Sequence, residues 1–373
     1  MAMEPKYNLN NLRQLIKEYG HVSISTFMEN VIAHYYRNAH SIGTDGDFIT
    51  APEISQIFGE MIGIWCVINW QNLGSPSKIS LIELGPGRGT LMNDILRATK
   101  HVKGFHDALE IVLIETSPKL HEMQKEKLSS WKKIKFSFAE NLSKLEPQAS
   151  LFIANEFFDA LPIYQYLKIK QYWYENIVTT LTFDGEFCIS NLPAPINIDN
   201  FLNYEFPHAG HRAVVETSPA SIDIIKKISH HISKYEGYAL IIDYGYDYKP
   251  DERLYFNSSL QAVKNHSYQP LLSDIGHADV TSHVDFFALK QAALDSGCNI
   301  FGSVSQRDFL TNLGIGARLE ILTKNSSPEE ERILRKGVER LISPELMGNL
   351  FKVLSISSQK MENNIGFTRV LEY

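Results

Sequence analysis

The sequence predicts an α/β fold: a parallel sheet covered by helices on both faces, with a helical N-terminal extension and an antiparallel β-rich insertion. Three observations predict it. Short apolar runs alternate with helical stretches after residue 79, which is the pattern of a parallel sheet. Apolar residues recur at helical spacing through the first eighty residues. A stretch rich in Tyr and Phe interrupts the alternation at 163–215.

Residues 1–78 are predicted to form the helical extension. Two apolar stripes have the helical period, the first ending at Tyr19 and the second at Tyr35. Between them and the next helix, 43–52 is rich in turn residues and is expected to be a surface loop. Thr50 and Glu53 fit a capping box with a proline in the first turn, so one helix is predicted from there to about residue 73.

The predicted strands of the parallel sheet lie at 79–84, 110–114, 135–138, 151–154 and 238–242. The segment 163–215 has alternating patterns broken by turn residues, and we expect an antiparallel arm laid over the sheet rather than an independent domain. From about residue 299 the pattern predicts a strand, two helices and a last strand at 350–356. Residues 79–373 are therefore assigned to one domain that carries the arm.

Composition excludes several classes of protein. With 36 Lys and Arg against 43 Asp and Glu, a net charge of −7 and no dense basic run, a nucleic-acid partner is not expected. The three cysteines have no metal-ligand spacing, which predicts no bound metal and a reducing compartment. No signal or transit peptide is visible in the first ten residues, and the longest apolar piece, 61–68, is far shorter than a membrane span. A bacterial cytoplasmic protein without membrane insertion is expected.

A glycine-rich loop follows the first predicted strand, in the segment ELGPGRGT from Glu83 to Thr90. Glycines at a strand-to-helix turn let the backbone approach a ligand closely. The next strand ends in Glu115, which is placed to accept hydrogen bonds from ribose hydroxyls. The third strand ends near Glu140 and Asn141, which are expected to contact adenine.

The charge and spacing of the loop indicate which ligand it binds. A pyrophosphate requires GxGxxG and a free helix N-terminus, whereas this loop is GxGxG with the acid Glu83 leading into it. A cationic ligand fits better, and S-adenosylmethionine carries both a sulfonium and an ammonium group. An oxidoreductase that uses a nicotinamide dinucleotide is a distant alternative, because the glycine spacing is wrong for it.

Polar residues follow the fourth predicted strand directly, in the segment NEFFDALP. Residues at this position lie at the carboxyl edge of an α/β sheet, where ligands bind. Asn155 and Asp159 have helix capping as an equally good interpretation, whereas Glu156 between apolar residues favours a functional role. Further along, Asp279, His283 and Asp285 do not have metal-ligand spacing, and capping is their plainer interpretation.

Taken together, these motifs resemble the MidA family. The resemblance covers residues 10 to 357 and is carried by GDFITAPEISQIFGE (46–60), ELGPGRG (83–89), NEFFDALP (155–162), IDYG (242–245), SHVDF (282–286) and MGNLFKVL (347–354). It implies a class I, Rossmann-like methyltransferase that depends on S-adenosylmethionine. Mitochondrial members are complex I assembly factors that act as protein arginine methyltransferases, which implies a complex I subunit as the protein substrate.

The resemblance also implies roles for individual residues. The cofactor site would comprise Asp47, Thr50, Glu83, Gly85, Pro86, Gly87, Gly89, Thr90, Glu115, Glu140, Asn141 and Asn155, with 43–52 covering the cofactor. Glu156 would be the first carboxylate of a clamp for the acceptor guanidinium, and Asp159 or Glu216 the second. His283 with Asp285 would order the opposite wall. Departures from the family pattern at Lys264 and 273–276 fall in 246–290, which is assigned to the substrate side.

Three questions stay open at this point. The chain could bind S-adenosylmethionine and act as an assembly chaperone without turnover. It could also methylate a small molecule, if its pocket is small, closed and apolar. The oligomeric state is open too, because aromatic-rich arms can pair in a homodimer or pack back on their own sheet.

Overall fold

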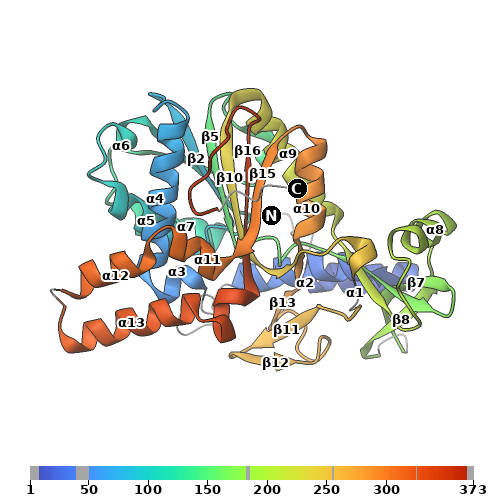
Figure 1. Cartoon of the computed structure of the whole chain (residues 1–373). Helices are drawn as coiled ribbons and strands as arrows, with labels where there is room; N and C mark the ends of the chain where they lie inside the picture. Colours follow the sequence, from blue (N-terminus) through green and yellow to red (C-terminus); the bar gives the residue numbers. More distant parts are fainter. Residues whose placement is uncertain (1–7, 39–49, 182–184, 254–255, 325, 368–373) are drawn as a thin grey trace.

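The computed structural model describes residues 8–38, 50–181, 185–253, 256–324 and 326–367. Its centre is a twisted sheet in the order β15-β16-β10-β5-β2-β3-β4 (Figure 1). The strands are β2 (Ile79–Leu84), β3 (Leu109–Ile114), β4 (Lys135–Ala139), β5 (Ser150–Asn155), β10 (Gly237–Tyr246), β15 (Asn299–Ser305) and β16 (Phe351–Ser357). Within this order, β16 runs antiparallel to the rest. The predicted fold class and the five predicted parallel strands are confirmed.

Helices cover both faces of the sheet, because its strands are apolar on both sides. In β5, Leu151 and Ile153 face one core, and Phe152 and Ala154 face the other. The first core is closed by α4 (Gln56–Asn72), α5 (Thr90–Thr99), α11 (Gln306–Asn312) and α12 (Ile315–Thr323). The second is closed by α9 (Pro219–Tyr235) and α10 (Phe286–Asp295). Each fully buried Leu, Ile or Phe side chain in these cores contributes roughly 1.5–3 kcal/mol to folding.

The order of the strands fixes where a ligand can bind. The chain runs outward from β2 to β3 and β4, through α6 (Phe105–Ala108) and α7 (Pro118–Leu128), and then crosses to β5 on the other side of β2. The connections therefore diverge between β2 and β5. In open α/β sheets, ligands bind in the crevice at the carboxyl ends of the strands at such a point.

The N-terminal part is helical but differs from the prediction in two places. Between α1 (Leu9–Tyr19) and α2 (Ile24–Asn38), the short β1 (His21–Ser23) pairs with the arm. The single helix predicted from Thr50 is wrong: α3 (Ala51–Ile54) ends at Ser55, whose extended backbone (φ −155°) breaks the helix and whose hydroxyl caps α4. The capping box is also absent, because the Glu53 carboxylate accepts a hydrogen bond from Thr90 Oγ1 at 2.6 Å instead.

The insertion is antiparallel, as predicted. It comprises β6 (Tyr164–Ile169), β7 (Tyr172–Thr180), β8 (Phe187–Pro193), α8 (Ile196–Glu205) and β9 (Val214–Thr217). In Figure 1, β7, β8 and α8 project to one side of the central sheet rather than lying over it. We call these residues, 164–217, the arm.

Two further segments complete the fold. Between β10 and α10, a three-stranded sheet is formed by β11 (Gln261–Lys264), β12 (Ser267–Gln269) and β13 (Asp279–Thr281). The short β14 (Val284–Asp285) pairs in parallel with the end of β10. Between β15 and β16 the described residues form three α-helices, and not the predicted two helices, followed by a short π-helical segment at Pro344–Gly348. The third α-helix, α13 (Pro328–Ile342), starts separately at a capping box of Ser327 and Glu330. Among the described residues, no helix is long and apolar enough to cross a membrane.

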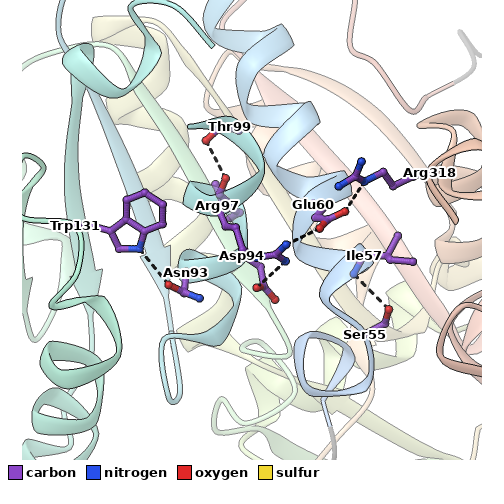
Figure 2. Close-up of polar contacts among 10 residues, drawn as sticks. Ser55, Ile57, Glu60, Asn93, Asp94, Arg97, Thr99, Trp131 and Arg318 are labelled. Carbon is purple, nitrogen blue, oxygen red and sulfur yellow. Dashed lines mark hydrogen bonds and ion pairs between the residues drawn. The ribbon is translucent and has the colours of Figure 1, made fainter. Parts of the chain in front are cut away.

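A buried ion-pair cluster holds three of the helices together (Figure 2). Glu60 on α4 is 1% exposed, and its two carboxylate oxygens pair with Arg97 Nη1 at 2.8 Å and Arg318 Nε at 2.6 Å. Arg97 also pairs with Asp94 at 3.1 Å. Because α5 begins at the glycine-rich loop, this cluster fixes the loop relative to α4.

Candidate active site

A cavity of about 580 Å³ opens at the carboxyl ends of β2, β3, β4, β5 and β10. It lies at the point where the connections diverge, as the strand order requires. Residues from α2, α3, α9 and β13 complete its walls. The N-terminal extension therefore contributes directly to the cavity, with Tyr36 from α2 and Thr50 at the start of α3.

The glycine-rich loop forms one wall. Gly85 has a φ of +63°, and a Cβ built there would lie 2.9 Å from Cδ2 of Phe157, so any other residue would strain this turn and displace the Phe157 ring or the loop. Pro86, Gly87 and Thr90 also line the cavity. Gly89 does not; it precedes α5 as its N-cap in the left-handed conformation. The side chain of Gln124 holds the loop by donating to the Gly87 carbonyl at 2.7 Å.

Glu83 lies in the last part of β2, just before the loop, and lines the cavity. It is 3% exposed, and its Oε2 has no hydrogen-bond partner among the described residues. Burial raises the pKa of this carboxyl to about 8. A buried carboxylate oxygen without a donor is unfavourable, and an ammonium group in the cavity would supply that donor. Glu83 thus fits the cationic ligand predicted from the sequence.

Two further predicted acids lie on the same side of the cavity. Glu115, just after β3, lines it, and its Oε1 accepts hydrogen bonds from the backbone of Thr116 at 2.7 Å and Ser117 at 2.8 Å. This arrangement holds the carboxyl in a fixed orientation. Glu140 and Asn141 follow β4 and also line the cavity. Asn141 in addition caps the short helical turn Leu142–Lys144 by accepting from Ser143 N at 3.0 Å.

Asn155, Glu156 and Asp159 line the cavity beyond the glycine-rich loop. Glu156 has a φ of +49°, unusual for a side chain other than glycine. Its Oε1 accepts from the backbone of Ala51 at 3.0 Å and from Asn155 Nδ2 at 3.3 Å. Burial is the main cause that raises the pKa of Glu156 to about 7 and that of Asp159 to about 6. Both pKa values suit groups that exchange a proton near neutral pH.

Two residues of β10 organise this second group, and the sequence reasoning gave neither of them a role. Oδ2 of Asp243, fully buried, accepts from the backbone N–H groups of Phe157, Phe158 and Asp159 at 2.9–3.2 Å. The Tyr244 hydroxyl lies 2.7 Å from Asp159 Oδ2, to which it donates, and 2.6 Å from Thr281 Oγ1. The segment IDYG pointed to this strand end, but its contact with the loop after β5 depends on the two strands being neighbours.

Among the described residues, four of the predicted site residues are not found in the cavity wall: Gly89, Glu216, His283 and Asp285. Glu216 does not line it, because its carboxylate is buried among residues of the arm and of 258–259. His283 does not line it either, and its ring packs edge-on against Tyr244 with 5.5 Å between the centroids. Asp47 and most of the predicted covering loop lie outside the described residues. Asp285 caps α10 by accepting from Ala288 N at 3.0 Å, the plainer of its two interpretations.

The cavity is strongly acidic. Eight acids line it among the described residues, namely Glu29, Glu53, Glu83, Glu115, Glu140, Glu156, Asp159 and Asp279. The corresponding basic residues are Arg37, Arg88 and Lys227. Low-dielectric walls with this charge attract cationic ligands. In the described part of the chain, no group of three or more His, Cys, Asp or Glu side chains could hold a metal ion.

Comparison with known proteins agrees with this chemistry. A family model of S-adenosyl-L-methionine-dependent methyltransferases matches residues 61–304. The mitochondrial protein arginine methyltransferase NDUFAF7 of Xenopus laevis is 33% identical over 93% of this chain and 84% of its own length. The human protein of the same name is 31% identical over 93% and 82%.

Solved structures confirm the fold. A Burkholderia thailandensis protein bound to S-adenosyl-homocysteine has a TM-score of 0.82 at 24% identity, covering 96% of this chain and 93% of that one. A second structure from the same organism has a TM-score of 0.82 at 25% identity, covering 96% and 94%. The glycine-rich loop, the unsatisfied Glu83 and these matches agree, and the chain belongs to the MidA-like family of S-adenosyl-L-methionine-dependent methyltransferases.

Proposed function

We propose that the protein transfers a methyl group from S-adenosylmethionine to an arginine side chain of a protein, with a respiratory complex I subunit as the substrate. The carrying observation is the pair of buried carboxyls, Glu156 and Asp159, next to the glycine-rich loop in an acidic cavity. Gly85 and Phe157 are close enough that the two parts of the cavity are contiguous. The names of the relatives, which are protein arginine methyltransferases, support this acceptor.

The residues around the glycine-rich loop would hold the cofactor. Glu83 would pair with the ammonium group, Glu115 would accept hydrogen bonds from the ribose hydroxyls, and Glu140 and Asn141 would lie beside the adenine. When bound, the cofactor supplies an activated methyl group on its sulfonium. The backbone of the loop excludes water from that side, since Gly85 packs directly on Phe157.

Glu156 and Asp159 would bind and orient the acceptor. A guanidinium is cationic and planar, with its donors in a fixed fork, so two carboxylates can hold it in one orientation. Its charge is delocalised, and hydrogen bonds from one side concentrate electron density on the attacking nitrogen. Alignment of that nitrogen with the methyl group supplies roughly 7–11 kcal/mol of the barrier reduction.

The reaction also releases one proton. The sulfonium gives up its methyl group and its positive charge and becomes a neutral thioether, while the methylated guanidinium still carries a single positive charge. The attacking nitrogen must therefore lose a proton as the methyl group is added. Glu156, with a pKa of about 7, is matched to accept it near neutral pH. Asp243 and Tyr244 hold the acceptor end in place, since they bond to the backbone of 157–159 and to the Asp159 carboxylate.

The test is methyl transfer from labelled S-adenosylmethionine to purified complex I subunits, with the modified residue identified by mass spectrometry. We expect label on arginine, and Glu156→Gln should lower the rate roughly a hundredfold, the usual cost of removing one such electrostatic contact. Glu122→Gln is the matched control, because Glu122 is an exposed acid paired with Lys125 on α7. Label on another residue type, or only on a small molecule, would contradict the proposed acceptor.

Two further expectations accompany this proposal. Light scattering measures the oligomeric state: twice the chain mass would indicate a homodimer formed through the arm, and a single chain mass would indicate a monomer whose arm is free for the substrate. The cytoplasmic location stays a prediction, to be tested by fractionation of the source cells.

A further inference from the structure

Glu216 is a buried acid that the proposed chemistry does not use. It lies in β9 of the arm, is 4% exposed, and does not line the cavity. Its Oε1 accepts from Gln165 Nε2 at 2.9 Å and from Ser259 N at 3.0 Å, and its Oε2 accepts from the Ser259 hydroxyl. Since a buried carboxylate is stable only when it is fully hydrogen-bonded, these contacts fix the backbone at 258–259 against the arm.

From Ser259, a chain of contacts leads to the acceptor end of the cavity. The Ser259 hydroxyl also accepts a hydrogen bond from the backbone N–H of His283 at 2.9 Å. The His283 ring packs edge-on against the Tyr244 ring, at 5.5 Å and 84°. The Tyr244 hydroxyl donates to Asp159 Oδ2 at 2.7 Å. Next to His283, the backbone N–H of Ser282 donates to the Asp159 carbonyl at 2.9 Å.

We propose that Glu216 is a positioning residue that couples the arm to the acceptor end of the site. Through Ser259 it sets the position of residues 282–283, and these hold the Tyr244 hydroxyl on the Asp159 carboxylate. This inference rests on the proposed function, because it assigns the acceptor to Asp159. It changes the role expected for Glu216 from contact with the acceptor to support of the residues that contact it. His283, expected to order the opposite wall of the site, supports Tyr244 instead.

The coupling has a signature in the pH profile. The hydrogen bond from Tyr244 lowers the pKa of Asp159, against the burial that raises it. If Tyr244 moves away, the pKa of Asp159 rises. Asp159 is then protonated at a higher pH, and the protein loses its affinity for the acceptor at that higher pH. The other titratable groups facing Asp159 are Glu156, Asp243 and Tyr36, for which no contact with Ser259 is found among the described residues. His283 is bonded to Ser259, but burial lowers its pKa and the charge of Glu216 raises it, so loss of that charge would move the His283 pKa down and not up. An upward shift of the acidic limb therefore reports on Tyr244 and not on general loss of folded protein.

The experiment compares Ser259→Ala and Glu216→Gln with the control Asn203→Ala. Asn203 makes a polar contact within the arm, to Asp199 at 3.2 Å, but has no connection to Ser259. We expect the KM for the acceptor protein to rise roughly tenfold in Ser259→Ala, the effect of one lost hydrogen bond. The acidic limb of kcat/KM should shift to higher pH, and the Kd for S-adenosylmethionine should stay within about twofold of wild type. Asn203→Ala should leave all three quantities unchanged.

Two results would overturn the inference. One is an unchanged acceptor KM and pH limb in both test variants. The other is a parallel loss of cofactor binding, turnover and melting temperature, which a merely structural role would cause. Hydrogen exchange measured by mass spectrometry keeps the test independent of the acceptor: 157–159 and 281–283 should exchange faster in Ser259→Ala than in Asn203→Ala. If the wild type methylates no arginine, the proposed function fails, and unchanged exchange is then the result that rejects the coupling.

Discussion

Binding of the cofactor is predicted to release a proton from Glu83. Burial raises the pKa of this carboxyl to about 8, so about nine tenths of the protein carries a neutral Glu83 at pH 7 before ligand binds. An ammonium group beside this carboxyl favours its ionised form, and Oε2 has no hydrogen-bond donor among the described residues. Binding therefore shifts the pKa down and expels the proton.

The size of the effect follows from linkage. Below pH 8, the Kd for the cofactor should fall nearly tenfold for each unit by which the pH rises, since one proton leaves per ligand bound. A rise in pH has the opposite effect on the folding stability of the free protein. The pKa of Glu83 in the folded state lies above the ordinary value of 4.5, so folding stability falls as the pH rises from about 4.5 through about 8. Glu83→Gln should abolish both dependences and weaken binding roughly tenfold to a hundredfold, the effect of one charge-assisted hydrogen bond.

Titration calorimetry with S-adenosylhomocysteine measures this directly. Repeating the titration at pH 6 and pH 7, in two buffers of different ionisation enthalpy, gives both the Kd and the number of protons released. Glu175→Gln is the matched control, because burial also raises the pKa of Glu175 but this acid lies in the arm, outside the cavity. A wild-type Kd that does not change with pH, together with no released proton, would refute the role assigned to Glu83.

Three further predictions concern the loop, the acceptor end and the helix cluster. Gly85→Ala should raise the Kd for S-adenosylhomocysteine at least tenfold in calorimetry, because the new methyl group would lie 2.9 Å from the Phe157 ring and displace the loop. The control is Gly74→Ala, which should bind S-adenosylhomocysteine as wild type does, because Gly74 is also at positive φ but has open space around it. Asp243→Ala should lower the free energy of unfolding in urea by several kcal/mol, since each of its buried N–H donors left unpaired costs about 1–3 kcal/mol; an unchanged midpoint would show that Asp243 does not hold the loop. Glu60→Ala should destabilise the protein by about 3 kcal/mol, because Arg97 and Arg318 lose their shared partner. The loss is not larger, because both arginines stay partly open to water. Glu122→Ala removes only an exposed ion pair and should unfold at the wild-type urea concentration.

The central sheet could be predicted from the sequence because its strands are apolar on both faces and separated by helices. Elements that depend on tertiary contacts could not. The strand β1 has three residues between two helices, and its identity comes only from pairing with β7. At Thr50 the capping-box pattern is present in the sequence, but the Glu53 carboxylate accepts a hydrogen bond from Thr90 on another helix instead. Ser55 then ends the first helix and caps the second.

The same distinction applies to the site. Glu83, Glu115 and Glu156 could be predicted to line one cavity because each lies at or just beyond the carboxyl end of a parallel strand. Glu216 also lies near a strand end, but its strand belongs to the antiparallel arm, to which that rule does not apply. The roles of Asp243 and Tyr244 depend on the pairing of β10 with β5, which the sequence does not specify.

The most direct test of a single cavity with a cofactor end and an acceptor end is a comparison of Glu156→Gln with Gly85→Ala. For each variant, titration calorimetry gives the Kd for S-adenosylhomocysteine, and labelled methyl transfer gives the turnover. We predict that Glu156→Gln keeps its Kd within about threefold of wild type while turnover falls roughly a hundredfold, and that Gly85→Ala loses binding. Equal loss of binding in both variants, or full turnover in Glu156→Gln, would contradict the account.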